Sequence, residues 1–188
     1  VLMNTDTQIL DMFRCAHPEG PRIMLQAYRQ HVYSLIASVV PNMQDTEELT
    51  QDTFLAAFRD IARFKPERGS LATWIYKIAY NKALSFISRK QPDIIALDED
   101  CIDSIAVSDE VVDRELSNAE EHQIEALERE LQLLPSEDRL IITLYYYEGC
   151  KVVDIAAIVD TTPFNIYHRL QRIRHKLYRR LYPLMKNI

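Results

Sequence analysis

Apolar residues recur every three or four positions along most of the chain, the spacing that places them on one face of a helix. This pattern predicts helices over residues 23–39, 45–64 and 70–90, with Pro and Gly interrupting it over 65–70. Ser70 is expected to cap the third of these helices. Its predicted buried face comprises Leu71, Ile75, Ile78, Ala79, Ala83 and Ile87. No segment shows the strict alternation typical of strands, so the sequence predicts an all-α fold.

The second half of the chain repeats this helical pattern in shorter pieces. Helices are predicted over 118–134, 137–147, 151–159 and 163–181, with Ser136 capping the second of them and Gly149 ending it. Thr162 suits a helix cap, and Pro163 suits the first helical position after it. The buried stripe of the last helix is predicted to comprise Ile166, Leu170, Ile173, Leu177 and Leu181.

Charge divides the chain into blocks that match these helical groups. Residues 91–134 hold two arginines against fourteen acidic residues, whereas 22–90 and 135–188 each carry a net charge of +4. Residues 91–117 also lack any apolar period. We therefore expect an N-terminal extension over 1–21, a helical domain over 22–90, an acidic linker over 91–117 and a second helical domain over 118–188.

Composition excludes several classes of protein. Three glycines cannot build a Gly-rich phosphate loop, and three widely spaced cysteines without a C-x-x-C pair argue against a zinc ribbon or disulfide framework. That cysteine pattern is typical of a reducing compartment, so a cytoplasmic protein is expected. The longest uncharged stretch, 32–44, contains Pro41 and is too short to cross a bilayer. No catalytic constellation is visible, and neither an enzyme nor a metal or cofactor is expected.

The short helix, tight turn and basic helix at the C-terminus have the proportions of a helix-turn-helix. The polar faces of the last helix carry Asn165, His168, Arg169, Arg172, Lys176 and Arg179. Residues in its first two turns would reach base edges, and later cations would contact phosphates. The alternative is an amphipathic helix with a solvated basic face.

The 70–90 helix has a second polar face. It carries Trp74, Lys77, Asn81, Ser85 and Ser88, a combination that suits unpaired bases stacking on an aromatic ring beside a cation. The alternative is that Trp74 belongs to the core. On the preceding helix, Glu48, Asp52, Leu55 and Arg59 form a mixed stripe that could dock a protein.

Together these segments resemble the bacterial RNA polymerase sigma factors of the extracytoplasmic-function (ECF) subgroup. The segment from Asp45 to Phe58 is similar to the family's polymerase-binding segment, and the segment from Phe64 to Asn81 to its promoter-melting segment. Leu134-Pro-Ser-Glu-Asp-Arg139, Tyr147-Glu-Gly149, Val153-Asp-Ile-Ala156 and the segment from Arg169 to Leu177 resemble its minus-thirty-five-binding domain.

The resemblance implies a sigma factor that binds core RNA polymerase, recognises promoter DNA and opens it. Polymerase binding, to the largest catalytic subunits, would fall to Glu48, Leu49, Gln51, Asp52 and Leu55. Minus-ten binding would fall to Arg68, Trp74, Lys77, Asn81 and Ser85. Minus-thirty-five binding would fall to Asn165, Tyr167, His168, Arg169, Arg172 and Lys176. The resemblance also implies an anti-sigma factor as partner, often membrane-anchored in this family.

The chain departs from the family pattern around the predicted turn. Asp160 replaces the usual Gly, and Asp tolerates a left-handed backbone better than most residues. Pro163-Phe-Asn165 replaces small residues and Gly-Thr, and Tyr167-His168 replaces a basic-Ser pair. The preferred promoter is therefore not predictable from the family.

Two other functions remain open at the level of sequence. One is a helix-turn-helix regulator that binds duplex DNA as a symmetric dimer, which would leave the first domain unexplained. The other is an adaptor that binds polymerase without reading DNA, which would leave the face around Arg169 and Arg172 unused.

Overall fold

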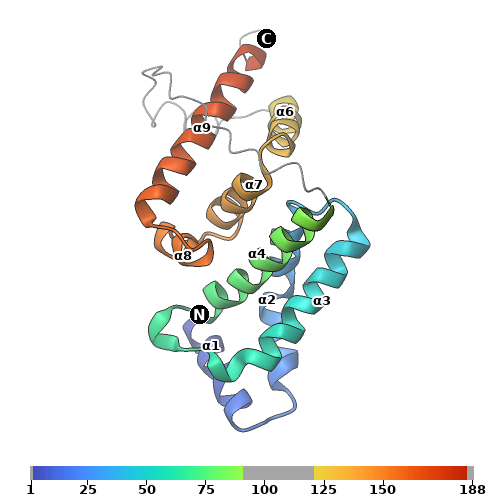
Figure 1. The fold of residues 1–188 in the computed structure, drawn as a ribbon, viewed down its shortest axis with the longest axis vertical. Coiled ribbons are helices and arrows are strands. Elements are labelled where there is room, and N and C mark those ends of the chain that lie inside the picture. The colour runs from blue at the N-terminus through green and yellow to red at the C-terminus, as the bar shows by residue number, and fades with distance from the viewer. Residues whose placement is uncertain (1, 91–120, 186–188) are drawn as a thin grey trace.

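The fold was taken from a computed structural model, which describes the backbone of residues 2–90 and 121–185. Every regular element in these two ranges is helical, as predicted (Figure 1). The predicted acidic linker, 91–117, and residues 118–120 of the next predicted helix lie outside the described residues. The described helices form two groups, one before and one after that gap.

The first group contains α1 (Leu2–Arg14), α2 (Gly20–Ala37), α3 (Met43–Asp60) and α4 (Leu71–Lys90). Asn42 caps α3 by accepting the Asp45 N–H at 3.0 Å, and Ser70 caps α4 by accepting the Thr73 N–H at 3.1 Å. The second cap was predicted. The core of this group is fully enclosed and includes Met24, Val32, Leu35, Ile36, Phe54, Leu71, Ile75 and Ala79.

Helix α1 was not predicted, because residues 1–21 were expected to be an extension. Ile9 is fully buried in the core, and Phe13 stacks on Phe58 with ring centroids 5.9 Å apart. The Tyr28 hydroxyl also donates to the Asp6 carboxylate. The four-residue spacing of Ile9 and Phe13 was the available signal, but two positions are too few to establish a period.

The second group contains α6 (Glu121–Gln132), α7 (Ser136–Ile142), α8 (Val152–Ile158) and α9 (Pro163–Met185). A π-helical turn over Thr143–Tyr147 follows α7, so the predicted helix 137–147 changes type halfway. The predicted cap at Ser136 is wrong, because Pro135 occupies the cap position and α7 has no side-chain cap. All five predicted positions of the α9 stripe are buried.

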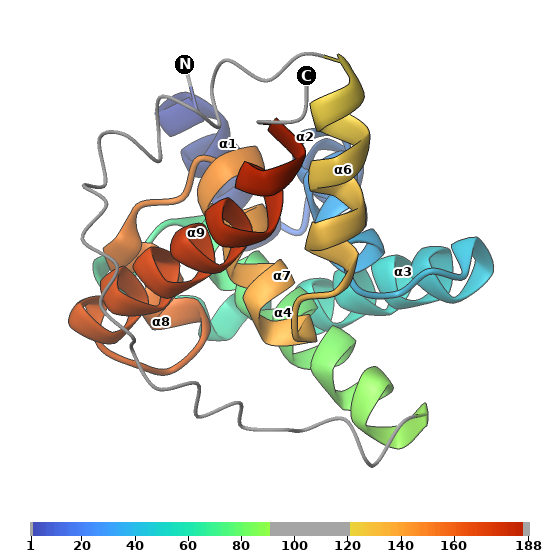
Figure 2. The same cartoon turned by 90° about the horizontal axis from the view of Figure 1, so that it is seen from above.

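The two groups pack directly on each other. Helix α4 runs along the first group and contacts α7 and α8 of the second, as Figures 1 and 2 show from two directions. Its Tyr76 and Tyr80 are 5% and 6% exposed in this contact zone. The α4 face predicted to bind DNA therefore lies on a helix that packs against α8, the first helix of the predicted helix-turn-helix.

Candidate functional site

Helices α8 and α9 form the predicted helix-turn-helix. The turn between them contains Asp160 with a φ of 55°, so the residue that replaces Gly does adopt the left-handed conformation. Thr162 caps α9 by accepting the Asn165 N–H at 3.2 Å, and Pro163 is the first helical residue. The Asn165 side-chain amide also donates to Thr161 Oγ1 at 3.1 Å. The first turn of α9 is therefore anchored to the preceding turn by two hydrogen bonds.

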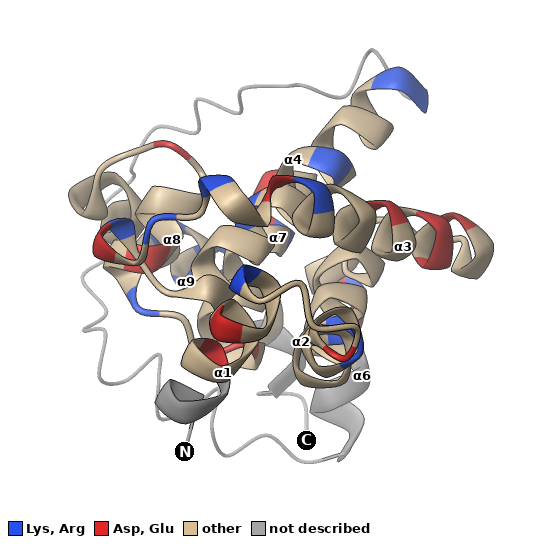
Figure 3. Ribbon diagram, turned by 90° about the horizontal axis from the view of Figure 1, so that it is seen from below, with Lys and Arg blue, Asp and Glu red and all other residues tan. Residues whose placement is uncertain are grey.

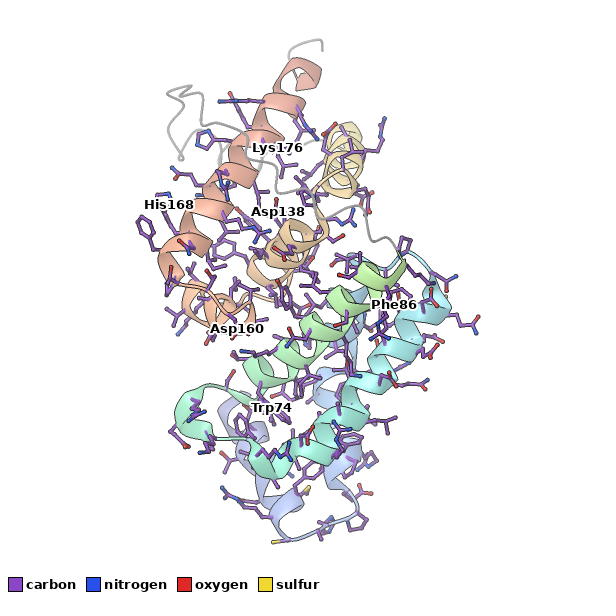
Figure 4. The ribbon with its side chains drawn as sticks, viewed as in Figure 1. Trp74, Phe86, Asp138, Asp160, His168 and Lys176 are labelled. Atoms are coloured by element: carbon purple, nitrogen blue, oxygen red, sulfur yellow. The ribbon has the colours of Figure 1, made fainter. Side chains whose placement is uncertain are left out.

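Four of the six residues predicted to contact the minus-thirty-five element are exposed: Asn165, Tyr167, His168 and Arg172. His168 projects from the outer side of α9, away from the other helices (Figure 4). Lys176, two turns further on, is half-buried. The structure thus brings a continuous set of polar and aromatic side chains to one open face of α9.

Arg169 lies differently. Its Nε donates to Asp138 Oδ1 at 2.5 Å, and its Nη2 donates to Glu137 Oε2 at 2.8 Å. Burial opposes the charge of Arg169, but the two carboxylates outweigh burial and raise its pKa above the ordinary value. Both carboxylates belong to the first turn of α7. The structure therefore gives the guanidinium a role in joining α9 to α7, and the predicted base contact has no support in this geometry.

The predicted minus-ten face of α4 is only partly open. Asn81 and Ser85 are exposed on α4, and Arg68 is exposed at the end of the short 3₁₀ helix Pro66–Arg68 that precedes it. Trp74 is half-buried, and its ring centroid lies 5.6 Å from that of Phe64. Its exposure is therefore intermediate between the two predicted alternatives, an exposed stacking residue and a core residue. Lys77 is engaged across the boundary: it donates to the Asp160 carboxylate and, at 3.1 Å, to the Ala157 carbonyl.

The predicted polymerase-binding stripe lies along α3. Glu48, Gln51, Asp52 and Leu55 are exposed, and Leu55 is 63% exposed despite being apolar. Leu49, predicted with them, is 9% exposed and packs mainly in the core. Figure 3 shows the acidic positions along the outer part of α3.

A groove of about 480 Å³ is lined by residues of α3 and α4, two helices that otherwise pack directly on each other. Its α3 wall includes Glu48 and Asp52, and its α4 wall includes Asn81 and Ser85. An ion pair of 3.6 Å between Lys82 and Asp52 crosses it. The groove therefore combines residues that the sequence analysis assigned to two separate functions.

Sequence reasoning missed the polar cluster between the two groups. The Glu148 carboxylate, 3% exposed, lies 2.7 Å from His31 Nδ1 and accepts the Tyr76 hydroxyl at 3.2 Å. Burial and this carboxylate raise the pKa of Tyr76 well above its ordinary value. Glu148 is more than 70 positions from either partner, so no local pattern could have identified the contact.

The described residues show no other site chemistry. No group of three His, Cys, Asp or Glu side chains among them could hold a metal ion. Within the same ranges, no helix has the length and apolar character needed to cross a membrane. Burial raises the pKa of Cys150 to about 12, so its thiol stays protonated and unreactive near neutral pH.

Comparison with known proteins identifies two family regions in this chain. Residues 24–92 match the region described as Sigma-70 region 2, and residues 124–177 match the one described as Sigma-70, region 4. Together the matches cover more than half of the chain. The first region runs from the second turn of α2 to the end of α4, and the second includes α8 and most of α9.

Relatives of similar length and a solved structure are similar to this chain over most of its residues. The chain is 25% identical to the ECF RNA polymerase sigma-E factor of Escherichia coli (strain K12), over 97% of both chains. It is also 25% identical to the ECF RNA polymerase sigma factor SigW of Bacillus subtilis (strain 168), over 84% of this chain and 87% of that one. Its fold is similar to the sigma factor RpoE in complex with the anti-sigma factor NepR from Bartonella quintana. That match has a TM-score of 0.63 and 20% identity, and covers 87% of this chain and 98% of the other.

Proposed function

The chain belongs to the sigma-70 family, in its ECF subgroup, and from that membership we propose how its residues divide the work of transcription initiation. It is an alternative sigma factor that directs RNA polymerase to promoters and starts transcription. The observation that carries this conclusion is the presence of both sigma regions, in order, on one chain. We assign residues 22–90 to region 2 and 118–188 to region 4, with 91–117 as the acidic linker between them.

We propose that the open face of α9 reads the minus-thirty-five element. Asn165, Tyr167, His168 and Arg172 are exposed in its first three turns, the part of a recognition helix that reaches base edges. Lys176 lies further along, where phosphate contacts position the protein. Arg169 supports this face by holding α9 against α7 and is a positioning residue.

For region 2, we propose that residues of α3 have one partner, and that residues of α4 and of the segment before it have another. Glu48, Gln51, Asp52 and Leu55 would contact the largest catalytic subunits of core polymerase. The unpaired minus-ten strand would be held by stacking on Trp74 and by hydrogen bonds from Arg68, Asn81 and Ser85. The carboxylates of α3 repel phosphates, so the strand's backbone would stay on the α4 side of the groove.

We propose further that the described arrangement is that of the free protein. Lys77 cannot contact the minus-ten strand while it is bound to Asp160 and Ala157. Promoter binding would therefore require α4 and the helix-turn-helix to separate at this point. A net charge of −6 also disfavours binding to free DNA, since affinity depends on neutralising phosphates.

An anti-sigma factor is the partner that we propose beyond polymerase and promoter. The structural relative of Bartonella quintana was solved with such a factor, NepR. A partner of this kind would cover the α3–α4 groove or the open face of α9 and keep the protein from polymerase. We place the protein in the cytoplasm, where polymerase and promoters are, and propose that it has no catalytic activity of its own.

The test is reconstitution with bacterial core RNA polymerase on fragmented genomic DNA, followed by sequencing of the transcript starts. Starts that share two spaced upstream motifs are expected, and these motifs would define the promoter. A stable complex with core that yields no starts would favour a polymerase adaptor. No complex, with dimeric binding to duplex DNA, would favour a conventional helix-turn-helix regulator.

A further inference from the structure

A large apolar side chain stands on the face of α9 proposed to enter the major groove. Phe164 is the second residue of α9 and is 70% exposed. Exposing a phenyl ring to water forfeits the stabilisation that burying it would give, so its position contributes little to folding. Its direct neighbour Asn165 is tied to Thr161, and the α9 cap holds the backbone beneath it. The ring is therefore presented from a fixed first turn.

Phe164 forms one row with two residues already assigned to DNA reading. Its ring meets the His168 ring edge to face, with centroids 4.2 Å apart. His168 and Arg172 follow at spacings of four residues, which places all three on the same side of the helix. We call Phe164, His168 and Arg172 the reading row. The Tyr167 ring borders the row, 5.8 Å from His168.

The chemistry of the major groove gives this ring one preferred contact. Base edges there present hydrogen-bond donors and acceptors, and the one apolar group among them is the 5-methyl group of thymine. A phenyl ring has no hydrogen bonds to offer, so a polar base edge facing it would be dehydrated without compensation. Contact with a thymine methyl group buries apolar surface on both sides.

We propose that Phe164 is a specificity-determining residue that selects thymine, through its 5-methyl group, at one position of the minus-thirty-five element. This inference rests on the proposed function, because it assumes that α9 enters the major groove. A protein partner docking on the same aromatic rings is the competing explanation. The row itself favours DNA, because Arg172 continues it and cations dominate the rest of α9.

The experiment begins with the promoter found by mapping transcript starts. Each thymine of its minus-thirty-five element, on either strand, is replaced singly by deoxyuridine, which removes the methyl group and keeps the base pair. Binding of holoenzyme to each duplex is measured with wild-type protein, with Phe164→Ala and with Phe164→Leu. Leu133→Ala is the matched control, since Leu133 is 66% exposed but precedes α7, outside the helix-turn-helix.

One deoxyuridine position is expected to weaken binding by the wild-type holoenzyme about three- to fivefold, the scale set by burial of one methyl-sized group. Phe164→Ala should bind this duplex and the thymine duplex equally. Phe164→Leu should retain part of the preference, and Leu133→Ala all of it. Thermal unfolding of each variant, monitored by circular dichroism, checks that Phe164→Ala is folded.

Three results would overturn the proposal while leaving the sigma factor function intact: an element without thymine on either strand, deoxyuridine tolerated at every position, or a preference that survives Phe164→Ala. Loss of polymerase or anti-sigma binding in Phe164→Ala, with thymine preference unchanged, would assign the ring to a protein partner instead. Failure of the wild-type protein to direct any transcription would refute the proposed function itself.

Discussion

Replacement of Arg169 by alanine separates a positioning role from base reading. The change removes two charge-assisted hydrogen bonds, of 2.5 Å to Asp138 and 2.8 Å to Glu137. The Arg169 side chain is 27% exposed and that of Asp138 is 17% exposed, so the ion pair between them is poorly hydrated. Glu137 is 46% exposed, and water can replace much of its contact.

The magnitude follows from these exposures. A hydrogen bond to a charged group contributes about 1.5–3 kcal/mol when it is shielded, which applies to Asp138. The exposed pair with Glu137 adds about 0.5 kcal/mol. Asp138 lies in the first turn of α7, where the helix dipole offsets about 0.5 kcal/mol of the loss. Arg169→Ala should therefore destabilise the protein by about 2 kcal/mol, with Asp138→Asn giving much of the same loss and the two changes not adding.

The assay combines urea unfolding with promoter binding by holoenzyme. Arg169→Ala should lower the urea midpoint while leaving the ratio of affinities for the promoter and a scrambled duplex unchanged. Arg172→Ala is the matched control, because Arg172 is exposed on the same helix: it should leave the midpoint unchanged and cost about 1–3 kcal/mol of discrimination. Normal stability with lost discrimination in Arg169→Ala would refute the positioning role and restore the base contact predicted from the sequence.

Three other predictions concern α4 and its boundary with region 4. Trp74→Ala should spare polymerase binding but impair strand opening, and an unchanged permanganate footprint on the melted strand would contradict this. Asp160→Asn keeps a residue that tolerates the left-handed turn but removes the charge bound to Lys77. This variant of the free protein should bind a minus-ten single strand up to about fivefold more tightly, because an exposed ion pair contributes about 1 kcal/mol or less. Fluorescence anisotropy measures that gain, and equal binding would show that Asp160 does not compete with the strand. Burial raises the pKa of Tyr80 from 10.0 to about 12, so the protonated side chain stabilises the folded protein fully below pH 10. The free energy of unfolding should then fall by up to about 1.4 kcal/mol per pH unit as the pH rises from 10 toward 12. Urea midpoints measured against pH should show this loss, and Tyr80→Phe should reduce its slope.

Helix positions were predictable because each depends on a local period and local end signals. The α9 stripe, the Thr162 cap and the left-handed Asp160 all follow from residues within one or two turns of each other. Prediction failed where a residue's role depends on partners far along the chain. Helix α1 is fixed by core contacts to later helices, and the end of α7 becomes π-helical, with the Glu148 N–H bonded to the Thr143 carbonyl five residues back.

The candidate site, like the fold, was predictable only where a residue's role follows from its local helical position. Helical spacing correctly placed Asn165, His168 and Arg172 on an exposed face, since exposure follows from the position of the apolar stripe. The same reasoning could not show that Arg169 meets two carboxylates about 30 positions earlier. The sequence marked Phe164 only as part of a departure from the family pattern, and helical spacing alone assigned it to neither the buried stripe nor the DNA-binding face.

Arg169 and Lys77 were both predicted to contact DNA, but in the structure each is paired with a carboxylate. The two ion pairs differ in their exposure to water, and this difference matters for function. Arg169 and Asp138 are both largely shielded from water, so exchanging this contact for a phosphate would leave the poorly hydrated Asp138 carboxylate unpaired, at a cost that one new ion pair does not recover. Lys77 and Asp160 are 37% and 73% exposed, so a phosphate can take the place of Asp160 at Lys77 while water solvates the Asp160 carboxylate, with little change in free energy. We therefore expect the Arg169 contact to persist when the protein binds DNA and the Lys77 contact to break. Since Asp160 lies in the turn of the helix-turn-helix, breaking that contact also frees the end of region 4 that must approach the promoter.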